Sequence, residues 1–246
     1  MKYTKFWRFQ EVRKKIELLV LLLALAGIYT VSRNLEKYVQ SDQVKSEQER
    51  KMDLVVIDSG HGGSDPGKVG INEVLEKDIN LKISKQGEKE LKNKGYQVVM
   101  TREKDQMLAG ETSGNSKIQD MKARVDLINE KAPGLAVSIH QNSYHKEEIH
   151  GAQVFYYSHS AEGHTAAKLM QQALLGADSE NTRQEKANDT YYLLRRTQVP
   201  TIIVECGFLS NQQEAELLAG KDYQKKIAKA IATGIDEYLR NAADGT

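Results

Sequence analysis

Short runs rich in β-branched and aromatic residues alternate with stretches of helical periodicity between residues 53 and 241. Five runs are candidate strands: residues 54–58, 96–101, 135–140, 153–157 and 201–205. Their side chains are almost continuously apolar, which is typical of a mostly parallel sheet covered by helices on both faces. The sequence therefore predicts one α/β domain. The run at 153–157 follows the third strand after a short polar loop, so it is the best candidate for an antiparallel strand.

Apolar side chains recur every three or four residues between these runs, as expected of helices with one face toward a core. The stripes begin at Ile79, Ile118, Ala166 and Ile227. A further short helix is predicted over residues 211–219. Its start is indicated by Ser210 followed by Gln213, which resembles a capping box.

The N-terminus has a different pattern. Residues 1–15 hold six basic side chains and one acidic side chain, and no charge follows between Leu18 and Ser32. Basic residues before an apolar run are typical of a segment that directs export, with the basic end in the cytoplasm. We expect residues 1–15 to form a cytoplasmic head and 16–33 a transmembrane anchor or signal segment.

The uncharged stretch would form a helix of about 22 Å, shorter than the roughly 30 Å of a bilayer core. Ile16 and the long side chains of Lys15 and Arg33 could close the gap. Ala24 to Ala26 also resembles a signal-peptidase site, so retention and cleavage both remain open. In either case the following residues face the outside: a polar spacer over 34–52, the domain over 53–241 and a tail over 242–246.

Composition excludes several classes of protein. The formal net charge is +1, which argues against nucleic-acid binding, and three prolines with one cysteine exclude a proline-rich linker or a disulfide scaffold. The charge is unevenly distributed, because a head of +5 leaves −4 for the remaining residues. The net charge of +1 is therefore the sum of a basic N-terminal head and an acidic remainder.

Polar residues capable of chemistry follow the apolar runs. His61 comes just after the first strand, His140 and Glu205 end the third and last strands, and Glu76 lies where the first helix begins. Ligands bind at the carboxyl ends of the strands in open α/β sheets, so we expect these groups to converge. Two histidines and one carboxylate can hold a catalytic zinc ion, and a further carboxylate can take a proton from water.

Each residue alone has a simpler interpretation. A single histidine at a strand end is often structural, and Glu76 could merely complement the dipole of its helix. Glu205 is less easily explained, because a carboxylate at the end of an apolar strand is costly to bury without a cation or a role. The remaining histidines, 145, 150, 159 and 164, are predicted to be surface residues.

Two other patterns are set aside. Residues 62–68 match the loose spacing of a phosphate-binding loop, but Val69 stands where the hydroxyl residue should follow. Cys206 could suggest a thiol nucleophile together with His140. Neighbouring strand residues point to opposite faces, however, so a Glu205 that faces the site leaves Cys206 buried elsewhere.

Six motifs occur in an order that resembles a known family. They are Val56-Ile-Asp-Ser-Gly-His-Gly-Gly-Ser-Asp-Pro-Gly67, Glu76-Lys-Asp-Ile-Asn-Leu81, Thr101-Arg102, Arg124 with Asn129, Ser138-Ile-His-Gln-Asn-Ser143 and Val204-Glu-Cys-Gly-Phe-Leu-Ser-Asn211. Together they resemble the zinc-dependent N-acetylmuramoyl-L-alanine amidases of the amidase 3 family. Single motifs are only suggestive, whereas the ordered set covers nearly the whole predicted domain and is specific.

The resemblance implies a sheet of about six strands flanked by helices. It implies that His61, Glu76 and His140 bind one zinc ion per chain and that Glu205 is the catalytic glutamate. The implied substrate is peptidoglycan, cleaved at the amide between N-acetylmuramic acid and L-alanine. Glu73 competes with Glu76 by position, and Gln141 replaces a residue that is commonly small, which could alter contacts in the cleft.

The combination of an N-terminal apolar segment with a bare catalytic domain most resembles the germination-specific members found in spore-forming bacteria. These act on spore cortex and help to generate muramic-δ-lactam. A protein activator is a further expectation. Two alternatives stay open, another zinc peptidase of the cell wall and a catalytically weak wall-binding protein.

Overall fold

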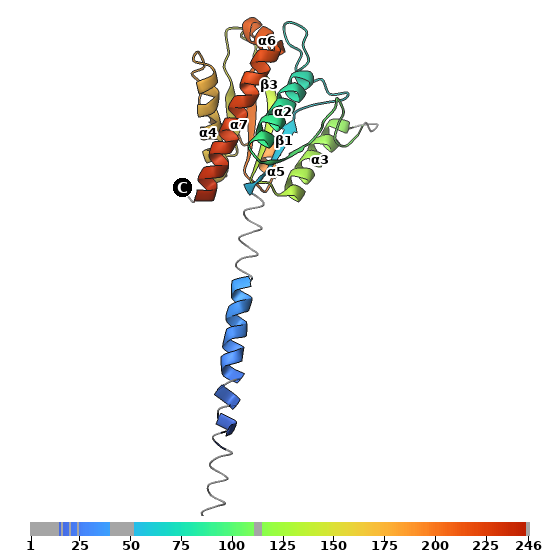
Figure 1. Ribbon diagram of the computed structural model, residues 1–246. Helices are drawn as coiled ribbons and strands as arrows, with labels where there is room; N and C mark the ends of the chain where they lie inside the picture. The colour runs from blue at the N-terminus through green and yellow to red at the C-terminus, as the bar shows by residue number, and fades with distance from the viewer. Residues whose placement is uncertain are drawn as a thin grey trace, which may run out of the picture. The chain divides into compact units, whose positions relative to one another are not determined.

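A computed structural model describes residues 15, 17–19, 21–23, 25–39, 52–110 and 115–244 (Figure 1). The chain divides into two compact units, Met1–Glu49 and Arg50–Thr246. In the first unit, the helix Glu17–Val39 is long and apolar enough to cross a membrane, and an 18-residue stretch of it has a mean hydropathy of 1.8. It continues beyond the uncharged run. Most of the predicted basic head and residues 40–51 of the spacer lie outside the described residues.

The second unit contains a six-stranded mixed sheet in the order β2-β1-β3-β6-β4-β5. Its strands are β1 (Leu54–Ser59), β2 (Gln97–Met100), β3 (Leu135–Asn142), β4 (Gln153–Tyr156), β5 (Lys186–Ala187) and β6 (Thr201–Phe208). Strands β2, β1, β3 and β6 are parallel neighbours, and β4 is antiparallel to β6. This confirms the predicted α/β class, the mostly parallel sheet and the antiparallel strand.

Helices cover both faces of the sheet. They are α2 (Glu76–Asn93), α3 (Ser116–Lys131), α4 (Ala161–Ala177), α5 (Tyr192–Arg196), α6 (Gln212–Ala219) and α7 (Lys221–Asp244). Helices α2, α4 and α7 pack side by side over one face, and α3 with α5 over the other (Figure 1). Helix α7 extends three residues into the predicted tail.

Core packing follows the apolar stripes of the sequence. On α7, Ile227, Ile231 and Ile235 are fully buried, and each such side chain contributes about 1.5–3 kcal/mol of hydrophobic free energy. Gly234 lies on the same helix, and a Cβ there would come within 2.9 Å of the Met170 Cα on α4. Its missing side chain therefore lets α4 and α7 approach closely. Ile118 differs from its prediction, because it is 55% exposed.

The start of α6 also corrects a prediction. Asn211, not Ser210, is the N-cap, and its side chain accepts a 2.8 Å hydrogen bond from the Glu214 backbone N–H. The Ser210 hydroxyl instead accepts from the Tyr144 backbone N–H at 2.9 Å. Both residues are favoured at caps, so the pattern was shifted by one residue.

Candidate functional site

The loop after β1 presents His61 in an unusual backbone conformation. His61 has φ 61°, and Gly62 and Gly63 follow with φ 135° and 56°. A left-handed conformation costs a non-glycine residue about 1–2 kcal/mol, so neighbouring contacts must hold it. The resulting turn directs successive backbone carbonyl groups toward the protein interior.

Two buried arginines bind those carbonyl groups. Arg124 donates to the carbonyl oxygens of Ser59 and His61 at 2.7 and 2.8 Å. Arg102 donates to the carbonyl oxygens of Ser59 and Gly60 at 2.9 and 3.0 Å. Arg124 is in turn paired with Asp58, at 2.6 Å, so its buried charge is compensated. Both arginines stood in the motifs of the sequence, and their contacts explain them as supports of the His61 loop.

Glu76 is the first residue of α2, and its side chain is 2% exposed. Its carboxylate accepts hydrogen bonds from the backbone N–H groups of Lys68 and Gln141 at 2.8 and 3.1 Å and from the Asn80 amide at 3.3 Å. Gly67, at φ 69°, leaves room for it, because a Cβ there would lie 2.5 Å from Glu76 Oε2. The carboxylate is therefore held from several sides.

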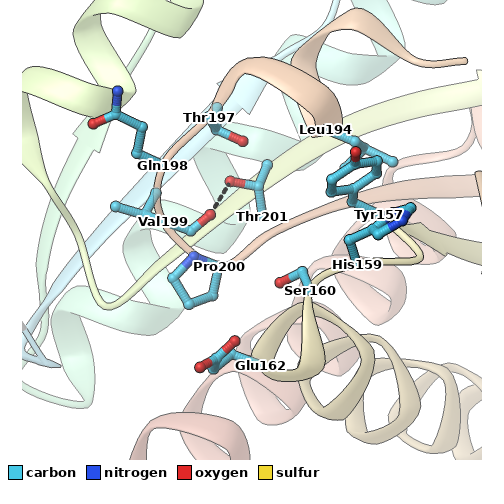
Figure 2. Close-up of a pocket in the computed structure, with 10 residues that line it drawn as sticks. All are labelled: Tyr157, His159, Ser160, Glu162, Leu194, Thr197, Gln198, Val199, Pro200 and Thr201. Carbon is cyan, nitrogen blue, oxygen red and sulfur yellow. Dashed lines mark hydrogen bonds between the residues drawn. The ribbon is translucent and has the colours of Figure 1, made fainter. Parts of the chain in front are cut away.

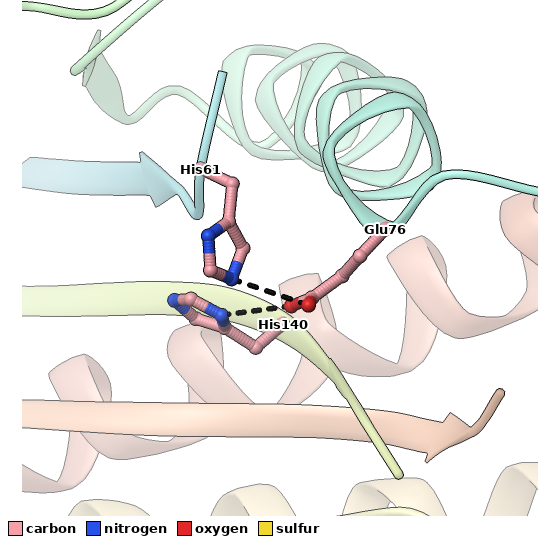
Figure 3. A group of neighbouring side chains, drawn as sticks. All are labelled: His61, Glu76 and His140. Atoms are coloured by element: carbon pink, nitrogen blue, oxygen red, sulfur yellow. Dashed lines mark hydrogen bonds and ion pairs between the residues drawn. The ribbon is translucent and has the colours of Figure 1, made fainter. Parts of the chain in front are cut away.

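His140, near the end of β3, completes a cluster with His61 and Glu76 (Figure 3). His140 Nδ1 lies 2.9 Å from Glu76 Oε1, and His61 Nε2 lies 3.2 Å from Glu76 Oε2. One potential ligand atom from each residue lies within 4.8 Å of the others. Two imidazoles and one carboxylate at this spacing match the donor set of a catalytic zinc site.

The charges of Glu76 and His140 shift each other's pKa. Burial opposes ionisation of Glu76 and His140, but their mutual contact outweighs it. The pKa of the Glu76 carboxyl is therefore lowered, and that of His140 is raised to about 9. A cation that binds between them must compete with protons, because imidazole ligands are neutral.

Glu205 stands beside the cluster, since β6 places it in parallel register with His140. It is 7% exposed, and its Oε2 atom has no hydrogen-bond partner among the described residues. Burial raises the pKa of Glu205 to about 7, and the nearby Glu76 adds to the effect. A carboxyl group of this kind can take up and release a proton near neutral pH.

Tyr191 precedes α5 and approaches Glu205 from the helical layer on that face. Its hydroxyl interacts with the Glu205 carboxylate, and burial together with this charge raises the pKa of Tyr191 to about 12. The ring of Tyr191 packs edge-on against Phe155, with centroids 5.6 Å apart. A neutral phenol is thus directed at the carboxylate.

Asp65 is a site residue that the sequence motifs did not indicate. Asp65 Oδ2 lies 2.8 Å from His61 Nδ1, which orients the imidazole so that Nε2 faces Glu76. Lys117 on α3 pairs with the other oxygen of Asp65 at 2.6 Å. A carboxylate four residues after a candidate ligand histidine was the available signal. Its position in a glycine-rich loop obscured it.

The exposure of the remaining candidate residues tests the other expectations from the sequence. Glu73 is exposed and lies outside the cluster formed by the described residues. Gln141 was expected to alter contacts in the cleft, but the structure buries its side chain instead. It is 2% exposed, and its amide donates to Asn80 Oδ1 at 3.1 Å beneath the site. Cys206 is fully buried in the core, and the four remaining histidines are exposed, as predicted.

A separate cavity of about 300 Å³ lies at the other end of β6 (Figure 2). It is lined by residues around the start of that strand and the start of α4, among them Tyr157, Ser160, Pro200 and Thr201. None of the cluster residues lines it. The chemistry predicted for His61 and Glu205 therefore belongs to the opposite end of the sheet.

The chain matches the N-acetylmuramoyl-L-alanine amidase family, Amidase_3, over residues 55–237. It belongs to this amidase family. The match spans nearly all of the second unit and includes His61, Glu76, His140 and Glu205. The resemblance found in the ordered motifs is thereby confirmed.

Individual relatives agree with this assignment. The germination-specific N-acetylmuramoyl-L-alanine amidase of Bacillus subtilis is 40% identical over 194 residues, which cover 78% of this chain and 81% of the relative. The solved CwlD amidase from Clostridioides difficile, in complex with the GerS lipoprotein, has a TM-score of 0.73 and 36% identity, over 76% of this chain and 98% of that one. The AmiC2 amidase of Nostoc punctiforme has a TM-score of 0.67 and 32% identity, over 76% and 97%.

Proposed function

We propose that this amidase hydrolyses the bond between N-acetylmuramic acid and L-alanine in peptidoglycan with one zinc ion per chain. The observation that carries the proposal is the position of Glu205, a buried carboxylate with an unpartnered oxygen, beside the cluster of His61, Glu76 and His140. The donor set of this cluster suits zinc, and the backbone contacts of Glu76 and His61 fix its geometry in advance.

Zinc held by His61, Glu76 and His140 would supply a water molecule of lowered pKa and a positive charge that polarises the lactyl carbonyl oxygen. Glu205 takes the proton as water attacks the carbonyl carbon. It then gives that proton to the nitrogen of the leaving alanine. Asp65 orients the His61 ring, and Tyr191 directs its hydroxyl toward Glu205.

The role of Glu205 is tested by digesting purified peptidoglycan with Glu205→Gln. We expect bound zinc to remain and the release of peptides with free N-terminal alanine to fall by about two to four orders of magnitude. Glu73→Gln is the matched control, because Glu73 is an exposed acid three residues before Glu76 and lies outside the cluster, and it should act like the unaltered chain. Near-normal release by the Glu205 variant would contradict its proposed role.

The ligand role is tested separately with His140→Ala, which should lose zinc on dialysis. Retention of one zinc equivalent per chain would contradict this assignment. The identity of the new amine distinguishes the alternatives: alanine indicates an amidase, another amino acid indicates a peptidase, and none, with or without chelator, indicates a wall-binding protein.

The spore cortex is the proposed location of the substrate, with muramic-δ-lactam formation and germination as the biological setting. The germination-specific relative of Bacillus subtilis supports this. We propose that the helix Glu17–Val39 anchors or exports the domain to the extracytoplasmic side. The complex of the Clostridioides difficile amidase with a lipoprotein supports an activator protein for this chain as well.

A further inference from the structure

Arg183 is a partly buried cation, and none of the carboxylates described in residues 52–110 and 115–244 forms an ion pair with it. Burial lowers its pKa, while the charge of Glu214 acts in the opposite direction. Glu214 is occupied elsewhere, because its two oxygens accept from the backbone N–H groups of Gly151 and Phe208 at 3.0 and 2.7 Å. A guanidinium that is only partly buried and has no carboxylate partner can bind an anion that reaches it from solution.

The side chain of Arg183 is held in place by uncharged groups. Its Nε donates to the His150 carbonyl oxygen at 2.6 Å, and its Nη1 donates to Gln153 Oε1 at 3.1 Å. The guanidinium lies 4.6 Å from the centroid of the Phe208 ring. These contacts hold the Arg183 side chain in one orientation, so less side-chain conformational entropy is lost when an anion binds to it.

The contact with Gln153 places Arg183 next to the proposed general base. Gln153 on β4 is directly paired with Glu205 on antiparallel β6, so the two side chains share one face of the sheet. On its other side, Glu205 is paired with His140. The order across the sheet is therefore His140, Glu205, Gln153 and then Arg183.

The order of these residues indicates where the leaving part of the substrate lies. This inference rests on the proposed function. Glu205 gives its proton to the leaving nitrogen, so the leaving peptide lies on the Glu205 side of the cluster. We propose that Arg183 binds a carboxylate of that peptide, on the residue after alanine. In peptidoglycan this residue is D-glutamate linked through its side chain, so that its α-carboxylate is free or is present as the amide.

A planar guanidinium binds a carboxylate through two parallel hydrogen bonds, which a carboxamide cannot reproduce. Arg183 thus makes the site selective for the acidic form of the stem peptide. Phe208 and Gln153 keep the guanidinium plane oriented, and Glu214 stays engaged with the backbone.

The test compares two soluble substrates that differ only at this carboxylate. Both are N-acetylmuramoyl tripeptides with amidated lysine at the C-terminus; one contains D-glutamate and the other D-isoglutamine. For the zinc-loaded chain we expect KM to be about tenfold lower with the acidic substrate. Arg183→Gln should abolish that difference by raising KM for the acidic substrate alone, and Arg183→Lys should restore part of it.

Arg196→Gln is the matched control, because Arg196 also lies over an aromatic ring, 5.7 Å from the centroid of Tyr192, but it belongs to α5. It should leave the preference unchanged. Equal KM values for both substrates in the unaltered chain, or an unchanged preference in Arg183→Gln with normal zinc content and melting temperature, would overturn the inference. Failure to cleave either substrate would instead count against the proposed function.

Discussion

Individual residues at the site are constrained mainly by the space that their neighbours leave. Gly60 shows this best. A Cβ built on Gly60 would lie 2.3–2.7 Å from three atoms of the His140 ring, which is closer than carbon atoms approach without displacement. His140 packs over bare backbone and so brings Nδ1 toward Glu76. The position requires glycine because of this approach, not because of its backbone angles.

Gly60→Ala should therefore displace the His140 ring and weaken zinc binding at least about tenfold, an effect of the size seen when support of a ligand is lost. Competition with a chromophoric chelator measures this. Gly176→Ala is the control, because a Cβ at Gly176 in α4 meets nothing within 4 Å. Zinc affinity in Gly60→Ala equal to that of this control would contradict the steric argument.

The ionisation of Asp58 makes the stability of the fold depend on pH. Burial alone would raise its pKa, but the Arg124 charge and hydrogen bonds from Ser138 and Thr101 outweigh it and lower the pKa from 3.8 to about 2. Its charged form stabilises the fold above pH 3.8, and that contribution is lost as the pH falls toward 2. The shift corresponds to about 2 kcal/mol.

We expect Asp58→Asn to lower the free energy of unfolding at pH 6 by about 3–5 kcal/mol, because Arg124 loses its buried partner. At pH 2 this difference should shrink by about 2 kcal/mol. Urea unfolding at both pH values measures it, with Asp126→Asn, exposed on α3, as the control. A difference that does not change with pH would show that Asp58 does not carry the effect.

The sequence predicted which chemical groups converge, because strand ends of a parallel sheet meet at one edge. It did not predict how they are held. Asp65, Arg102 and Arg124 act on His61 through loop geometry, and no periodic pattern encodes a loop. Gln141 shows the same limit, since strand alternation alone does not tell a cleft from a buried polar contact with Asn80.

At the scale of elements, long helices and apolar strands were predictable because each repeats its pattern several times. Strand β5 has two exposed residues and α5 has five residues, too few for either period to emerge. These short elements nevertheless position Tyr191 and follow Arg183. The part of the fold that the sequence missed therefore borders the site.

The start of α6 offers a direct test of an element boundary. Asn211→Ala should lower the free energy of unfolding by about 1 kcal/mol, because the Glu214 N–H loses its side-chain acceptor. Ser210→Ala should cost less, since its hydroxyl accepts an exposed bond from Tyr144. Urea unfolding decides between them. A larger effect at Ser210 would restore the boundary that the sequence pattern indicated.

At the scale of the whole molecule, the chain combines two units whose described surfaces differ in character. The described side chains of the helix Glu17–Val39 are exposed within the structure, including Leu18, Leu22 and Leu25. The second unit has its own core and contains every residue of the site. An exposed apolar surface of this kind is typical of a segment that contacts a membrane or a partner, whereas the apolar side chains of the second unit are packed into its own core.

Removal of residues 1–49 should therefore leave the melting temperature and the zinc affinity of the domain unchanged and abolish flotation with lipid vesicles. Full-length Leu25→Lys should float less than the unaltered chain, because Leu25 is the central residue of the uncharged run 18–32 and a charge at the middle of a spanning segment costs about 2.5–3.5 kcal/mol. Leu35→Lys is the matched control. Leu35 lies beyond the uncharged run, where a lysine can extend to the interface, so flotation should persist. Equal loss in both variants would show that the helix does not span the bilayer in the proposed register, and weaker zinc binding by the truncated chain would show that the two units are not independent.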